Sequence, residues 1–242
     1  MIRIFQNKRL ELMEQNKVFR YLKYAIGEIV LITIGILIAL QIDSFYAAQN
    51  DRATEKQLLL KLKTDLQRDT TDLNRLLKIK NDQSVACLYM LELYSNPHQI
   101  ITDTAKYIHS VFAPLIAFID YNPNRSIFEL AKSSGDLFTI KDQTLAETIT
   151  MYFSDNSLTQ HLSTTREYII NGFRLPAETY PINPARWTIQ VYQSYLNDFR
   201  IENLYITLMG SYDVDIQLIN EKKENAVNLM KEIDNQILQL EN

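Results

Sequence analysis

Cysteine, glycine and proline are scarce in this chain, which has one, five and six of them among 242 residues. A single thiol, Cys87, cannot form an intrachain disulfide. Helical spacing places Cys87 on an apolar seam, which favours a buried structural thiol over an intermolecular disulfide. Two of the glycines, Gly27 and Gly35, fall inside one apolar run. Turn-forming residues are therefore few elsewhere, and the composition favours long helices.

Short motifs of catalytic and metal-binding sites are also missing. The chain has no H-E-x-x-H, G-x-S-x-G or C-x-x-C motif and no glycine-rich phosphate loop. The histidines are scattered without a helical partner at i,i+4, so a metal site would need distant residues to converge; they are His98, His109 and His161. Paired carboxylates such as Asp213 and Asp215 are typical of solvated helix surfaces. We therefore predict no enzyme activity, no cofactor and no metal.

One long apolar run is present, over residues 24–42. It contains a single charge, Glu28, and no side chain more polar than Thr33 between Ile29 and Leu40. A helix of about 20 apolar residues crosses the hydrocarbon core of a bilayer. We predict a transmembrane helix here, with the lipid bilayer as its partner. A cleaved signal peptide is the alternative, but the run is longer than a typical signal core, and the best cleavage-like site has Phe45 at the −3 position.

Charge is distributed unevenly on the two sides of this run. Residues 1–23 carry a net charge of +4, and residues 43–242 carry −7. Since positive segments stay in the cytoplasm, we predict a cytoplasmic tail at 1–23 and an extracytoplasmic domain at 43–242. The acidic domain argues against nucleic acid as a partner. The tail itself is either an amphipathic helix on the inner leaflet or a frayed basic topology signal.

Small residues within the span suggest a face for helix association. Gly35 and Ala39 form a small-x-x-x-small pair, which lets another helix approach closely. Glu28 lies seven residues before Gly35 and so falls on nearly the same face. This face predicts a homo-oligomer or a membrane-protein partner. Alternatively, Glu28 extends to the inner headgroups, and the glycines have no role in assembly.

Two stretches of the sequence resemble a known family. The first is Tyr24-Ala-Ile-Gly-Glu-Ile29 followed by Gly35-Ile-Leu-Ile-Ala-Leu-Gln-Ile42, and the second is Asn122-Pro-Asn-Arg-Ser126 leading into Ser133-Ser-Gly-Asp-Leu137. Both resemble an uncharacterised family of single-span Gram-negative membrane proteins, a domain of unknown function. Where that family often has Asn and Trp after the Gln-Ile pair, this chain would use Phe45 or Tyr46 as its outer aromatic anchor.

The resemblance implies a membrane-anchored helical protein and supplies no activity. Together with the charge distribution, it predicts a single-pass protein of the bacterial inner membrane with a periplasmic C-terminal domain.

Heptad spacing predicts two long helices in the domain. Residues 49–94 contain no Gly or Pro and repeat apolar positions in steps of three and four, and residues 198–240 have the same period. We expect the two helices to pack antiparallel in an all-α bundle. Polar residues interrupt the two seams; they are Asp69, Lys80, Gln83, Asp215, Lys222 and Gln236. They either set register and oligomeric state or face solvent where the seam widens.

Shorter helices are expected between the long ones, within residues 102–196. Thr102-Asp103 predicts the start of a helix that Pro114 kinks or restarts, and Ser126-x-x-Glu129 predicts a capping box for a helix that stops at Gly135. Asp142 is expected to cap a helix through Phe153, and Ser157-x-x-Gln160 to open one that ends at Gly172. Residues 173–186 are expected to form a loop, and 187–196 a further helix.

Two further features have alternative interpretations. The loop Asn122, Asn124 and Arg125 can offer a guanidinium and backbone donors to a ligand, or it is a rigid turn in which Arg125 caps carbonyls or pairs with a carboxylate. The tyrosines at 192, 195, 205 and 212 either line a groove for peptide or glycan or pack at the edge of the core.

Two functional hypotheses follow. The first is a non-enzymatic membrane-anchored scaffold or interaction protein. The second is a sensor-like ligand-binding domain that signals through a partner, because the tail is too short for an output domain. An aromatic-lined pocket with one or two charges between the long helices would favour the sensor, whereas a filled core would count against it.

Overall fold

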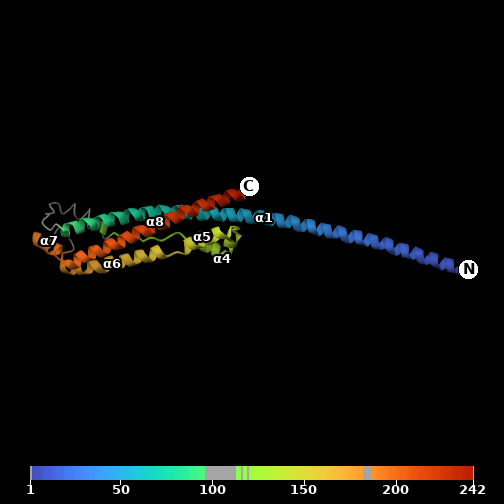
Figure 1. Ribbon diagram of the computed structural model, residues 1–242, viewed down its shortest axis with the longest axis horizontal. Helices are drawn as coiled ribbons and strands as arrows, with labels where there is room; N and C mark the ends of the chain where they lie inside the picture. The colour runs from blue at the N-terminus through green and yellow to red at the C-terminus, as the bar shows by residue number, and fades with distance from the viewer. Residues whose placement is uncertain (1, 96–112, 116, 119, 182–186, 242) are drawn as a thin grey trace. The chain divides into compact units, whose positions relative to one another are not determined.

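All regular structure in the described part of the chain is helical, as predicted. The computed structural model describes residues 2–95, 113–115, 117–118, 120–181 and 187–241 (Figure 1). The chain divides into two compact units, Met1–Thr54 and Glu55–Asn242. The first helix, α1 (Ile2–Ser95), contributes residues to both units.

Unit Met1–Thr54 consists of helix α1 alone among its described residues. From Ala25 to Asn50 every side chain is exposed. This part of α1 is long and apolar enough to cross a membrane, and none of its most apolar window is buried. The predicted helices at 24–42 and 49–94 are not separate elements, because no helix breaker lies between Gly35 and Pro97.

The two long helices pack antiparallel within unit Glu55–Asn242. The C-terminal helix, α8 (Phe199–Glu241), follows the second half of α1 (Figure 1). Lys56 Nζ lies 2.7 Å from Glu241 Oε1, whereas Lys80 Nζ, further along α1, lies 2.9 Å from Asp215 Oδ2. Partner numbers thus fall on α8 as they rise on α1, which confirms the predicted direction.

The predicted seams are confirmed by burial. Every predicted seam position from Leu59 to Met90 on α1, and from Ile201 to Gln236 on α8, is buried. Only the end positions, Tyr94 and Leu240, are partly exposed. Cys87 is fully buried, and its burial raises its pKa to about 12, so it is a structural thiol as predicted.

The shorter helices cover the long pair. They are α3 (Ala113–Leu115), α4 (Ser126–Ser134), the 3-10 helix η2 (Asp136–Thr139), α5 (Gln143–Ser154), α6 (Ser157–Thr179) and α7 (Ile189–Leu196). The Asp142 cap is confirmed, because its Oδ1 accepts from Leu145 N at 3.1 Å. Gly135 has φ 85°, which confirms the left-handed stop after α4. The predicted cap at Thr102-Asp103 lies outside the described residues.

Three local predictions are wrong. Neither Ser126 nor Ser157 caps its helix, since each is already the first helical residue. Helix α6 does not end at Gly172 but continues through Pro176 to Thr179. Proline removes only its own bond, to the carbonyl of Gly172, and helix packing outweighs that loss. The predicted loop at 173–186 therefore begins later, and Tyr180 N donates to Pro176 O at 2.8 Å.

The tyrosines pack inside the domain. Tyr195, Tyr205 and Tyr212 are fully buried, and the hydroxyls of Tyr195 and Tyr205 lie 2.8 Å apart. Trp187 and Tyr180 contact the ring of Tyr195, with centroids at 4.8 and 5.2 Å. These three buried tyrosines therefore belong to the core, as the packing interpretation predicted, and do not line a groove.

Candidate functional site

The predicted association face lies on exposed helix. Glu28, Gly35 and Ala39 all belong to unit Met1–Thr54, and all are exposed. A Cβ built on Gly35 meets nothing within 4 Å. Helical spacing gives the three residues a common face, and no other described part of the chain covers it.

The predicted ligand loop is engaged within the protein. Arg125 Nη2 donates to the carbonyl of Asp155 at 2.9 Å, at the C-terminus of α5. Asn124 Nδ2 donates to Asp65 Oδ1 at 2.8 Å, while Asn122 is exposed. Arg125 therefore caps a carbonyl, as the structural interpretation of this turn predicted, and the loop connects α5 and α1.

The polar residues that interrupt the two seams are all buried. Their alternative interpretation, that they face solvent, is therefore wrong. Gln83 Nε2 donates to the carbonyls of Pro114 and Ala117 at 3.1 and 2.7 Å. Gln236 Nε2 donates to Glu55 Oε1 at 2.9 Å. The other four form two clusters of charged and hydroxyl groups.

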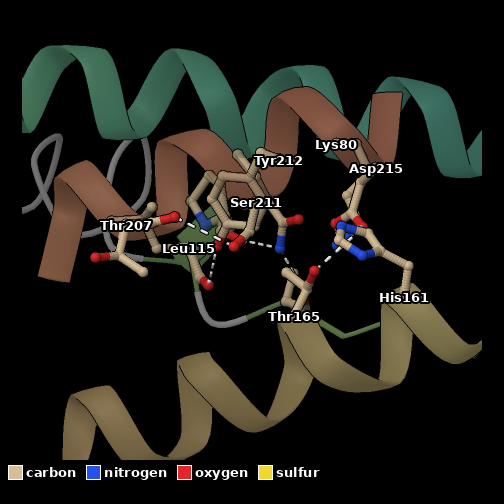
Figure 2. Close-up of polar contacts among 11 residues, drawn as sticks. Lys80, Leu115, His161, Thr165, Thr207, Ser211, Tyr212 and Asp215 are labelled. Carbon is tan, nitrogen blue, oxygen red and sulfur yellow. Dashed lines mark hydrogen bonds and ion pairs between the residues drawn. The ribbon is translucent and has the colours of Figure 1, made fainter. Parts of the chain in front are cut away.

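The first cluster surrounds Asp215, whose side chain is fully buried on α8 (Figure 2). Lys80 Nζ on α1 lies 2.9 Å from its Oδ2. On α6, Thr165 Oγ1 donates to Oδ1 at 3.1 Å, and His161 Nε2 lies 3.5 Å from the same oxygen. Lys80 also lies 5.1 Å from the ring centroid of Tyr212. Of the two interpretations of Asp215, the solvated carboxylate is therefore wrong and the buried seam position is correct, because three helices converge on it.

A cavity of about 260 Å³ adjoins this cluster. Helices α1 and α6 form its walls, and one side is lined by Ala117, Phe118, Asp120 and Tyr121. Its described lining includes Lys80, Tyr121, Arg166 and Phe118. Arg166 Nη1 lies 2.6 Å from Asp120 Oδ1, and the guanidinium carbon lies 5.2 Å from the Phe118 ring centroid. The lining of the cavity thus contains a nearly buried lysine and a partly exposed arginine.

The second cluster surrounds Asp69 on α1. Tyr121 donates its hydroxyl to Asp69 Oδ1 at 2.7 Å, and Tyr152 donates to Oδ2. Burial, reinforced by the adjacent Asp69 carboxylate, raises the pKa of both tyrosines far above the ordinary range, so both remain protonated donors. Asp69 therefore accepts two hydrogen bonds in the core, both from tyrosine hydroxyls.

Lys222 lies beside this cluster on α8. Its Nζ donates to Tyr152 O at 2.7 Å and to Asp155 Oδ2 at 3.1 Å, and it lies 4.1 Å from the Tyr152 ring centroid. Burial lowers the pKa of Lys222 despite the opposing effect of Asp155. An open groove of about 510 Å³ runs here between α5 and α8, lined by Met151, Asn225 and Asn228 among others.

Metal ligands do not cluster in the described part of the chain. No group of three His, Cys, Asp or Glu side chains there is arranged to hold an ion. His98 and His109 lie outside the described residues. The sequence gives His161 no helical partner at i,i+4, and the fold places its Nε2 3.5 Å from Asp215 Oδ1 on another helix. Lys80 and Asp215 could be found from the sequence because they are polar residues at seam positions. No local sequence pattern indicated that His161 and Thr165 would join them.

The fold and the buried clusters define an all-α protein with one helix suited to a membrane. The chain belongs to a family of unknown function (DUF6090), whose model matches residues 28–159. The match begins at Glu28, so it includes the first stretch from Glu28 onward, without residues 24–27, and the whole of the second stretch around α4. No curated protein and no solved structure matches the chain.

Proposed function

We propose that this protein is a non-enzymatic interaction protein of the bacterial inner membrane, anchored by residues 24–42, with residues 43–242 in the periplasm. The observation that carries the proposal is the fully exposed apolar surface of α1 from Ala25 to Ile42. So much apolar helix surface without a cover in the described chain requires lipid or a protein partner.

Charge supports the orientation. The tail at 1–23 has a net charge of +4, and the domain has −7. An N-terminus in the cytoplasm satisfies the positive-inside rule. The buried charges support a non-catalytic domain, because Asp215, Lys80 and Lys222 are all held in ion pairs between helices.

The span offers a specific surface for a partner. Glu28, Gly35 and Ala39 share a face, and Gly35 leaves room for a second helix to approach. A protonated or hydrogen-bonded Glu28 would then contact a polar group across that interface. The partner is either a second copy or another membrane protein.

Crosslinking in the native membrane tests this role. The full-length protein is crosslinked and captured beside Glu28→Ala and Gly35→Leu variants, and captured proteins are identified by mass. Thr33→Leu is the matched control, because a residue two positions away lies about 160° around the helix from Gly35. Loss of a defined membrane partner in the first two variants alone supports the proposal. Capture that none of the variants changes contradicts the association face.

Reporter fusions test the orientation separately. A reporter that is active only in the periplasm should be active when fused at the C-terminus and inactive at the N-terminus. The reverse pattern would contradict the proposed topology, whatever the crosslinking shows.

The sensor is a second candidate, favoured by the cavity beside Lys80. The seam positions of the two long helices are buried, which counts against the sensor as the sequence predicted it, and the cavity does not lie between those helices. It lies between α1 and α6 instead, and α1 is the helix that also contains the apolar run. A ligand that shifts α1 against α6 would give such a sensor its input.

A further inference from the structure

We propose that the cavity between α1 and α6 binds a small neutral organic molecule with an apolar body and a carbonyl-type acceptor oxygen. The oxygen accepts a hydrogen bond from Lys80, and the body packs between the two helices. This site is independent of the interaction role proposed above, since it lies within unit Glu55–Asn242 and needs no membrane partner.

Lys80 supplies the first argument. Its side chain is 9% exposed, and an ammonium group has three donors. Among the described residues, one acceptor lies close to its Nζ, namely Asp215 Oδ2 at 2.9 Å. Buried donors without acceptors are costly, so a lysine that lines a cavity with donors to spare favours an oxygen placed there.

The charges around the cavity select a neutral ligand. Lys80 is balanced by Asp215, and Arg166 is balanced by Asp120 at 2.6 Å. A bound anion would add a charge that no free cation in the described lining compensates, and burying such a charge is unfavourable. A carbonyl or amide oxygen accepts the same hydrogen bond without that cost.

The walls and the size define the rest of the molecule. Apolar side chains line much of the cavity; they include Leu76, Ile79, Leu162 and Ile169. The volume is about 260 Å³. A cavity of about 150 Å³ holds benzene, so this one suits a ring with a small polar substituent, on the order of ten non-hydrogen atoms. Arg166 and Asp120 are 45% and 82% exposed, so this pair marks the mouth.

Three probes of one shape test the proposal. Benzamide carries a neutral acceptor, benzoate carries an anion, and toluene carries no acceptor. Each is titrated into full-length protein in lipid nanodiscs and followed by ligand-observed NMR. Benzamide should bind saturably and about tenfold or more tighter than either other probe, because a hydrogen bond to a charged group contributes that much.

Ser163→Trp is the blocking variant, because Ser163 lines the cavity and is exposed on α6. Thr164→Trp is its matched control, since Thr164 is exposed and absent from the lining. Benzamide binding should be lost in the first and kept in the second. Partition of benzamide into the lipid contributes equally to the signals of both variants, so the difference between the two signals reports binding to the protein.

Lys80→Met combined with Asp215→Leu tests the hydrogen bond without adding bulk to the mouth. In this double variant benzamide and toluene should bind equally. The proposal is overturned if benzamide gives the same signal with wild type and Ser163→Trp, or keeps its preference in the double variant. Tighter binding of benzoate than of benzamide would overturn the neutral ligand class.

Discussion

Lys80 Nζ lies 2.9 Å from Asp215 Oδ2, and this ion pair joins α1 to α8 with both side chains buried. Each charge compensates the other in a low-dielectric surrounding. The pair favours one register of the long helices, because a shift of one residue on either helix would separate the two buried charges.

Removing one partner of this pair should destabilise the domain strongly. Lys80→Met leaves Asp215 buried without its cation and should cost about 3–5 kcal/mol of the free energy of unfolding. Lys80→Met with Asp215→Leu should recover most of that loss, because no charge is then stranded. Chemical denaturation measures both. The exposed pair Lys56–Glu241 is the control, and Lys56→Ala should cost no more than about 1 kcal/mol.

The stability of the domain should depend on both tyrosine hydroxyls that donate to Asp69. Tyr152→Phe removes one of the two hydrogen bonds that Asp69 accepts, and it should cost about 1.5–3 kcal/mol because the acceptor is a buried carboxylate. Tyr168→Phe, at a side chain that is 50% exposed, should change stability little. Equal thermal shifts for the two variants would show that the hydroxyl of Tyr152 does not stabilise the cluster.

Substitution by alanine should change the stability in opposite directions at two glycines within helices. A Cβ on Gly172 in α6 would lie 2.2 Å from Leu204 Cδ1, so Leu204 must adopt another rotamer, at a cost of about 1–3 kcal/mol. A Cβ on Gly210 in α8 meets nothing within 4 Å, so alanine there should stabilise the helix by about 0.5–1 kcal/mol. Thermal melts of both variants measure the difference, and a stabilised Gly172→Ala would contradict the contact.

Asp155 should make stability depend on pH in the acid range. Burial alone would raise its pKa, but hydrogen bonds from Ser157 and Lys222 outweigh that effect and lower it. A carboxylate with a lowered pKa stabilises the fold above its ordinary value of 3.8, and the stabilisation is lost as the pH falls below it.

Asp155→Asn should therefore be less stable than wild type at pH 7, and the gap should close in acid. Asp72→Asn, at an exposed position on α1, is the control and should show no such convergence. Denaturation curves measured across the pH range compare the three proteins. A gap that stays constant into acid would contradict the role of the ionised carboxylate.

The sequence by itself determined the helical periods and the apolar run. Seam positions repeat in steps of three and four whatever partner they meet, so burial of Leu59 to Met90 and Ile201 to Gln236 followed from spacing. Gly135 and Asp142 were predictable because a left-handed stop and a helix cap depend on single residues. The local rule failed at Pro176, because helix α6 continues through this proline where the sequence predicted a loop.

Only the tertiary structure decided which polar residues meet. Lys80 and Asp215 were visible as interruptions of two seams, but their pairing depends on the register of helices far apart in the sequence. His161 and Thr165 join them because α6 packs against α8 at that level. The spacing of apolar residues shows which face of a helix is buried. It does not show which other helix packs on that face, because that contact joins residues far apart in the sequence. The charged cluster and the adjoining cavity therefore arise only when three helices pack together.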